Sequence, residues 1–310
     1  INDDILAGCL PYLTYISIFS YGLSPDGGLI YADDERLLKY AAEYGVKAIL
    51  VLTSLTESGT FSSENVSAFL ESYEAQTRFI ENIIPLLKQK GYYGVDIDFE
   101  FIPPQYSEVF ADFIGRLADE LNAEGMILFT ALAPKISADQ PGLLYEGHNY
   151  RLLGEASNYV LVMTYEWGYT YGPPMAVAPI NSVRRVLDYA ITEIDPQKIF
   201  MGIPNYGYVW TLPFVQGESK ATSISNYEAV DLAAEFGSEI KFDETAQSPT
   251  FMYDNGQMNE VWFEDARSIQ TKLLTAFEYG FKGVSYWNLM RYFPQNWLVL
   301  NALFNINSIN

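Results

Sequence analysis

Two periods of apolar residues alternate along the chain. Short runs rich in β-branched and aromatic residues predict seven strands, near residues 12–20, 46–55, 92–100, 126–134, 159–167, 198–206 and 283–289. Helical periodicity marks residues 1–10, 33–44, 65–72, 76–90, 107–124, 149–157, 180–193, 267–279 and 296–304, and Pro85 predicts a bend or break in the fourth of these helices. Strands that alternate with helices predict βαβ units around a parallel sheet, and therefore an α/β fold.

Residues 211–260 interrupt this alternation. They hold a helical stretch, 226–236, and two strand-like segments, 248–254 and 258–263, on either side of Asn255-Gly256. An Asn-Gly pair between alternating segments is a strong signal for a β-hairpin. We expect a small α+β insertion here, within a single catalytic barrel domain that covers residues 1–310. The alternative is a surface loop that has no functional role.

The strand at residues 92–100 carries acids on one face. Side chains of a strand point alternately to opposite faces, so Asp96, Asp98 and Glu100 share one face, and apolar residues occupy the other. Carboxylates on a buried strand are costly unless they are paired and hydrogen-bonded. A solvated edge strand is one interpretation. A row of titrating acids at the end of a central strand is the functional one.

Charge and composition remove several classes of function. Lysine and arginine number 18 against 39 aspartates and glutamates, which gives a formal net charge of −21. Nucleic acids and anionic membrane surfaces attract basic proteins, so we expect neither as a partner. No apolar run reaches the length of about 18 residues that a membrane helix needs, so we expect no membrane insertion.

The chain has one cysteine, Cys9, and one histidine, His148. A zinc site built from cysteine and histidine is therefore not expected, and neither is an internal disulfide. His148 lies in the polar segment Glu146-Gly147-His148-Asn149, which predicts a surface-loop residue rather than a member of a catalytic triad. We expect no metal and no cofactor, so that the chemistry falls to carboxylates, tyrosines and tryptophans.

Residues 94–100, Gly-Val-Asp-Ile-Asp-Phe-Glu, resemble the catalytic strand of glycoside hydrolase family 18, the chitinase-like family. The family usually has an aspartate where Tyr93 stands. The longer run 98–104, Asp-Phe-Glu-Phe-Ile-Pro-Pro, is similar to a bacterial branch that includes spore-cortex-lytic N-acetylglucosaminidases. The resemblance implies a TIM (β/α)8 barrel, in which the strand absent from our seven is the first, just upstream of Ile1.

The resemblance also implies catalytic roles. Glu100 would protonate the glycosidic oxygen, Asp98 would orient the substrate's acetamido group, and Asp96 would share a proton with Asp98. Tyr165, in the Met-Thr-Tyr-Glu-Trp segment 163–167, would donate its hydroxyl to the acetamido oxygen. This family uses the substrate's own acetamido group in place of a second catalytic carboxylate.

Further residues are implied to bind the substrate: Trp287, Glu166, Asn205, Tyr206 and Trp167. Trp287 would stack under a sugar ring, whereas Glu166 replaces the aspartate that the family usually has there. Core packing is the alternative for the tyrosines and tryptophans. Chitinases show Ser-x-Gly-Gly where this chain has Thr53-Ser54-Leu55, a departure that favours the spore-lytic branch.

We interpret the sequence as a retaining glycoside hydrolase that cleaves β-1,4 bonds after N-acetylglucosamine in peptidoglycan or its fragments. A chitinase that acts on chito-oligosaccharides and an inactive sugar-binding protein of the same fold are the alternatives. We expect a monomer whose partner is a glycan containing N-acetylglucosamine. Because the chain starts at Ile1 without methionine, we expect sequence upstream. We also expect a secreted protein associated with the cell wall or the spore.

Overall fold

The computed structural model describes residues 1–306 and 309. All seven predicted strands are present: β1 (Tyr15–Leu23), β3 (Lys47–Thr53), β4 (Gly94–Asp98), β5 (Ile127–Leu132), β6 (Tyr159–Val162), β7 (Ile199–Pro204) and β13 (Gly283–Trp287). The predicted helices are α1 (Asp3–Cys9), α2 (Glu35–Tyr44), α3 (Ser63–Glu71), α4 (Tyr73–Lys90), α5 (Ser107–Ala123), α7 (Tyr150–Ala156), α8 (Ile180–Glu193), α10 (Ala266–Glu278) and α11 (Pro294–Leu303). The periodic signals therefore predicted the elements well.

The chain forms two compact units. The first comprises Ile1–Tyr12, Thr164–Asp188 and Met201–Ile306, and the second is built from Leu13–Met163 and Tyr189–Phe200. Among the residues that the structure describes, no helix is both long and apolar enough to cross a membrane.

A parallel sheet forms the centre of the second unit. Its strands run in the order β6-β5-β4-β3-β1, and the short β2 (Leu29–Ile30) pairs antiparallel with the end of β1. Strand β4 pairs on both sides, since Asp96 lies opposite Val51 of β3 and Phe129 of β5. β4 is thus a central strand, which argues against the interpretation of its acids as a solvated edge.

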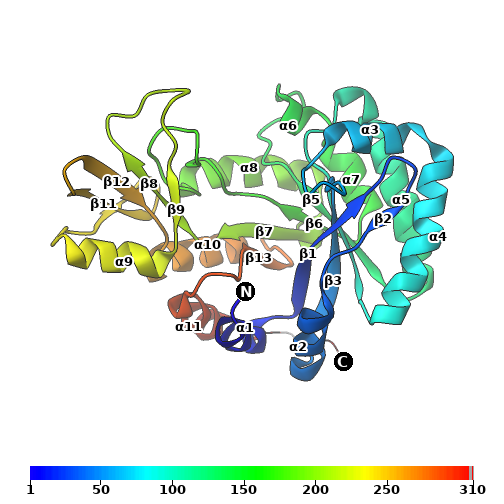
Figure 1. The fold of residues 1–310 in the computed structure, drawn as a ribbon, viewed down its shortest axis with the longest axis horizontal. Helices are drawn as coiled ribbons and strands as arrows, with labels where there is room; N and C mark the ends of the chain where they lie inside the picture. The colour runs from blue at the N-terminus through cyan, green and yellow to red at the C-terminus, as the bar shows by residue number, and fades with distance from the viewer. Residues whose placement is uncertain (307–308, 310) are drawn as a thin grey trace. The chain divides into compact units, whose positions relative to one another are not determined.

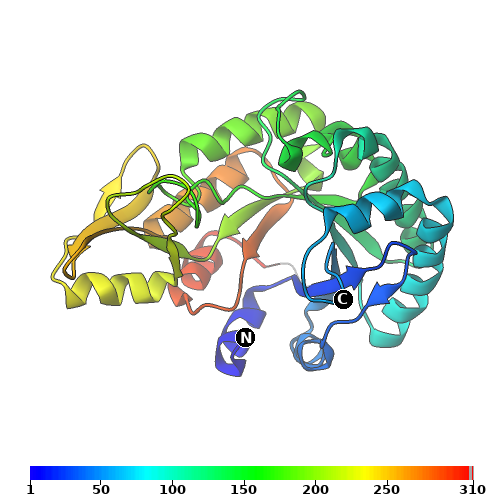
Figure 2. The ribbon, with the colours of Figure 1, turned by 45° about the horizontal axis from the view of Figure 1, so that its top comes forward.

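The outer face of this sheet is apolar and covered by helices. Val95 and Ile97 of β4 are fully buried on that face. Phe69 of α3, Phe79 of α4 and Phe113 of α5 form a cluster of edge-to-face rings with centroids 5.0–5.9 Å apart. Figure 2 shows α4 and α5 along the outer side of the strands. The acids of β4 consequently lie on the opposite, inner face.

One local prediction needs correction. Helix α4 is not broken at Pro85. It begins at Tyr73, three residues before its predicted start at 76, and the hydroxyl of Ser72 caps it by accepting from the amide of Ala75. Asp34 precedes α2 but does not cap it. Its carboxylate is buried and accepts hydrogen bonds from Tyr21 (2.5 Å), Tyr92 (2.7 Å) and Lys90 (2.6 Å).

Residues 211–260, which the sequence predicts to be an α+β insertion, lie in the first unit within a run of short strands and one helix. The elements of this run are β8 (Gly207–Thr211), β9 (Thr222–Ile224), α9 (Asn226–Glu235), β10 (Lys241–Asp243), β11 (Ser248–Asp254) and β12 (Met258–Trp262). The strands form an antiparallel sheet in the order β10-β11-β12-β8-β9. Helix α9 packs on it through Ala229 and Ala233, against Phe251 and Val261 (Figure 1).

Candidate active site

Asp96 and Asp98 belong to β4, and Glu100 follows two residues beyond the end of the strand. The sequence had placed Glu100 inside the strand. Asp96 is only 6% exposed, and one oxygen of each aspartate, Oδ1, has no hydrogen-bond partner among the described residues. Burial without such partners disfavours the charged form of a carboxyl group.

The pKa values of both aspartates are raised accordingly. Burial raises the pKa of Asp96 to about 7. Burial also raises the pKa of Asp98 well above its ordinary value, and the negative charges of Glu100 and Asp96 raise it further. Close carboxylates do not all ionise together, so this row retains a proton at mildly acidic pH. A row that holds a proton next to Glu100 suits acid–base chemistry.

The backbone around Glu100 is fixed by buried side chains. Phe99 and Ile102 are 0% and 1% exposed, whereas Phe101 between them is half-exposed and has a φ of +56°. A positive φ is uncommon for a residue with a side chain and persists where the surroundings hold it. The turn after β4 is therefore anchored on both sides of Glu100.

The prediction that His148 is a surface-loop residue is wrong. His148 is fully buried. The amide of Ala133 donates to its Nδ1 (2.9 Å), so Nε2 carries the proton and donates to the carbonyl oxygen of Phe99 (2.8 Å). Burial lowers the pKa of His148 to about 4. The sequence misled because Glu146 and Asn149, which flank the buried pair Gly147-His148, are exposed.

In the first unit, Glu166 is held by tyrosines. Its φ is +69°, and its carboxylate accepts hydrogen bonds from the hydroxyls of Tyr206 and Tyr208. Although the residue as a whole is exposed, burial of its carboxyl group raises the pKa of Glu166, and the two tyrosine hydrogen bonds oppose that rise. Sequence reasoning missed Tyr208. The alternation Tyr206-Gly207-Tyr208 was the signal that could have found it.

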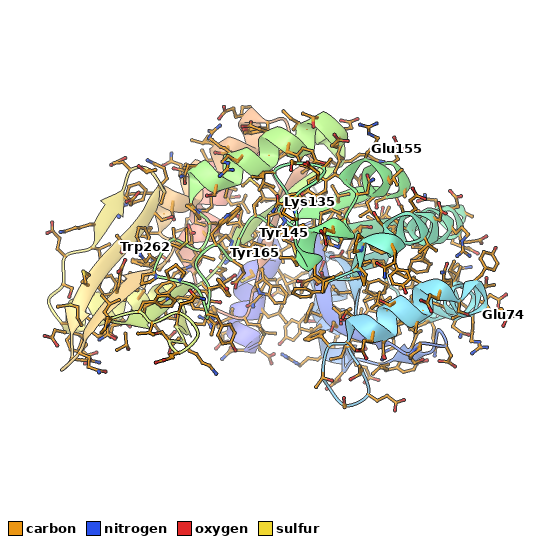
Figure 3. All side chains as sticks on the ribbon, turned by 90° about the horizontal axis from the view of Figure 1, so that it is seen from above. Glu74, Lys135, Tyr145, Glu155, Tyr165 and Trp262 are labelled. Carbon is orange, nitrogen blue, oxygen red and sulfur yellow. The ribbon has the colours of Figure 1, made fainter. Side chains whose placement is uncertain are left out.

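Tyr165 and Trp287 pack against one buried cluster, formed by Val177, Tyr206, Tyr208, Trp210 and Ala221. Trp262 of β12 packs against the same cluster, and Figure 3 labels it together with Tyr165. Trp167 is partly buried, and its amide donates to the carbonyl of Val177 (3.0 Å). The structure thus groups four of the predicted residues, Tyr165, Glu166, Tyr206 and Trp287.

The side chain of Asn205 makes its hydrogen bonds within the protein. Its side-chain amide is 4% exposed and donates to the carbonyls of Asn288 (2.8 Å) and Arg291 (3.1 Å). Its oxygen accepts from Asn226 (3.3 Å). These bonds fasten the loop that follows Trp287, so Asn205 shapes this loop. Over the described part of the chain, no group of three or more histidine, cysteine, aspartate or glutamate side chains is arranged to hold a metal ion.

A buried row of carboxyl groups at the end of a central strand is a candidate acid–base site. Comparison with known proteins shows the family to which the chain belongs. Residues 8–291 match the model of glycosyl hydrolases family 18. The chain is 40% identical to the cortical fragment-lytic enzyme of Bacillus subtilis over 298 residues, which are 96% of this chain and 69% of that protein. The chain belongs to glycoside hydrolase family 18.

Solved structures show the same relationship. The spore cortex-lytic enzyme SleL of Bacillus megaterium matches 99% of this chain and 71% of its own with a TM-score of 0.95 and 39% identity. A chitinase from Chromobacterium violaceum, 23% identical, shares the fold with a TM-score of 0.90 over 96% and 94% of the two chains. The fold class is therefore the TIM-like (β/α)8 barrel of this family, as the sequence predicted.

Proposed function

We propose that this protein is a retaining glycoside hydrolase that cleaves β-1,4 bonds after N-acetylglucosamine in peptidoglycan or its fragments. The supporting observation is the buried carboxylate row, in which burial, and then the charges of Glu100 and Asp96, raise the pKa of Asp98. The similarity to a cortical fragment-lytic enzyme favours peptidoglycan over chitin as the substrate. It also favours association with the spore.

In the proposed reaction, the substrate supplies the nucleophile. The oxygen of its 2-acetamido group attacks C1, the glycosidic C1–O bond breaks, and Glu100 gives its proton to the departing oxygen. Asp98 accepts a hydrogen bond from the acetamido N–H and holds the group in place. Water then opens the oxazolinium ion and returns a proton to Glu100, so the configuration at C1 is retained.

Asp96 has a supporting role in this proposal. Its pKa of about 7 lets it exchange a proton with Asp98 as the charge on the acetamido group changes. Tyr165 would donate its hydroxyl to the acetamido oxygen, and Trp287 would offer the face of its ring to a pyranose. Glu166, Tyr206 and Trp167 are the remaining candidates for sugar contacts, whereas Asn205 acts through the loop that it fastens.

Product analysis tests the proposal. Purified muropeptide chains and chito-oligosaccharides would each be treated with the wild-type protein and with Glu100→Gln. The products would be identified by mass spectrometry. Cleavage of muropeptides after N-acetylglucosamine, lost in the variant, is the expected result. Cleavage of chito-oligosaccharides but not of muropeptides would indicate that the protein is a chitinase. Binding of either glycan without cleavage would indicate a sugar-binding protein.

A further inference from the structure

The segment between α6 (Leu143–Glu146) and α7 contacts the β4 chain on both sides of Glu100. We propose that Gly147 and His148 position Glu100, by fixing the backbone immediately before it and two residues after it. This inference rests on the proposed role of Glu100 as the general acid. Neither residue would touch the substrate, so both are positioning residues.

His148 fixes the peptide plane that enters Glu100. The carbonyl of Phe99 and the amide nitrogen of Glu100 belong to one planar peptide group. The hydrogen bond of 2.8 Å from Nε2 of His148 to the Phe99 oxygen therefore sets the orientation of that plane. The imidazole also accepts from Ala133 at the end of β5 and packs beside the ring of Phe110 (centroids 6.2 Å apart). The ring thus joins the ends of two neighbouring strands.

The surroundings keep this hydrogen bond in one state. Nδ1 must keep its lone pair to accept from Ala133, which leaves the only ring proton on Nε2. The buried ammonium of Lys135 (Figure 3) donates to the carbonyls of His148 and Ala138, each at 3.0 Å. Its positive charge disfavours a second proton on the imidazole. The donor to Phe99 is therefore present throughout the pH range of a mildly acidic enzyme.

Gly147 fixes the backbone after Glu100 because it lies in close contact with Ile102. A Cβ at this position would lie 2.3 Å from the carbonyl oxygen of Ile102 and 2.5 Å from its Cβ. The φ of Gly147 is −73°, an ordinary value, so the need for glycine is one of space and not of backbone conformation. Because Ile102 is buried, an added methyl group would have to displace backbone. The strained Phe101 lies between the two fixed points.

Two substitutions, each of which keeps the hydrogen bond of one ring nitrogen, separate positioning from simple packing. In His148→Gln, the side-chain amide nitrogen replaces Nε2 and still donates to Phe99. In His148→Asn, the side-chain oxygen replaces Nδ1 and accepts from Ala133, but nothing donates to Phe99. Ser157→Ala is the matched control, because it removes another buried hydrogen bond of β5, that of Thr130 and Ser157 (2.8 Å), without touching β4.

The experiment measures kcat and KM on purified muropeptide chains, and the thermal midpoint of each variant. We expect His148→Asn to lower kcat by about tenfold to hundredfold with little change in KM, since a small misplacement of a catalytic group costs this much. His148→Gln should restore most of kcat, and Ser157→Ala should lower the thermal midpoint with kcat nearly unchanged. A kcat for His148→Asn within twofold of wild type, or equal losses in both His148 variants, would overturn the proposal.

A pair of glycine variants provides an independent arm. Gly147→Ala should lower kcat, whereas Gly115→Ala of α5, where a Cβ would meet only Ala156 at 3.9 Å, should not. If His148→Asn does not fold, these two glycine variants test the positioning of Glu100. Equal kcat values for Gly147→Ala and Gly115→Ala would then refute it. Glu100→Gln is measured alongside. If this variant turns over substrate normally, Glu100 is not the general acid, and the positioning proposal is refuted as well. If it is inactive while His148→Asn is fully active, positioning alone is refuted.

Discussion

The hydroxyl of Tyr208 lies 3.1 Å from Oε1 and 3.3 Å from Oε2 of Glu166 and donates a hydrogen bond to this carboxylate. Tyr206 donates to the same group. The aspartate usual in the family would be one methylene shorter. Two tyrosines from the β7–β8 segment thus hold the longer glutamate side chain of this protein in a fixed orientation.

Removing the Tyr208 hydroxyl should therefore loosen Glu166. Tyr208→Phe deletes a hydrogen bond that lowers the pKa of Glu166, so that pKa should rise further above its ordinary value. The loss of one such bond should reduce the free energy of unfolding by about 1 kcal/mol. An NMR titration of the Glu166 carboxyl carbon measures the shift. Tyr253→Phe, in β11 of the same antiparallel sheet, serves as the control, and an equal response in both variants would contradict the assignment.

Glu100→Gln should lose turnover while keeping the fold. Loss of general-acid assistance costs about 10²-fold or more. The substitution also removes a negative charge that raises the pKa of Asp98, so the pKa of Asp98 should fall in the variant. Single-turnover kinetics and an NMR titration of Asp98 follow these two effects. Near-normal turnover would remove Glu100 from the role of acid, whatever the titration shows.

Asp96→Asn should stabilise the protein, and more so at high pH. The pKa of Asp96 is raised from 3.8 to about 7 by folding, so the folded state binds the proton more tightly. Its contribution to stability is complete below about pH 3.8 and is lost as pH rises through about 7. A shift of about 3 units corresponds to roughly 4 kcal/mol as an upper bound. Asparagine does not ionise and avoids this loss.

Urea unfolding of wild type and Asp96→Asn at pH 4 and pH 8 tests this expectation. The stability difference in favour of the variant should grow from pH 4 to pH 8. A difference independent of pH would show that Asp96 does not titrate between these values. Turnover should fall in the same variant, because a side-chain amide at this position cannot exchange a proton with Asp98.

Lys272→Met should destabilise the protein strongly. Lys272 and Glu264 are each 1% exposed, with 2.8 Å between Nζ and Oε2. Removing one partner leaves a buried charge and costs about 3–5 kcal/mol. Burial already raises the pKa of Glu264, so the orphaned carboxyl group should take up a proton and the cost should be smaller at pH 5 than at pH 8.

Thermal and urea unfolding of Lys272→Met, alone and combined with Glu264→Met, measure this cost. The double variant should regain much of the lost stability, because no unpaired charge remains. Arg184→Met is the matched control, since its pair with Glu278 (2.6 Å) is exposed and should be worth less than about 1 kcal/mol. Equal losses from Lys272→Met and Arg184→Met would contradict the role given to burial.

Local pattern was enough to predict most of the elements. The strands and helices follow from periods of two and 3.6 residues, which the chain carries within each segment. The Asn255-Gly256 pair located the β11–β12 hairpin because its turn needs a positive φ, and Gly256 has a φ of +102°. Helix interiors and ends were less secure, since α4 runs unbroken through Pro85 and begins at Tyr73 rather than at residue 76.

The acids and the family were also determined by the sequence alone, because Asp96, Asp98 and Glu100 lie close together in the sequence and form one recognisable motif. What only the tertiary structure decided depends on residues far apart in the chain. His148 and Phe99 are separated by 49 positions and Tyr208 and Glu166 by 42, so no local period records either contact. A polar sequence context favoured an exposed histidine. Burial of this ring against β4 and β5 reversed that prediction, since a buried polar ring is stable only when both nitrogens find partners.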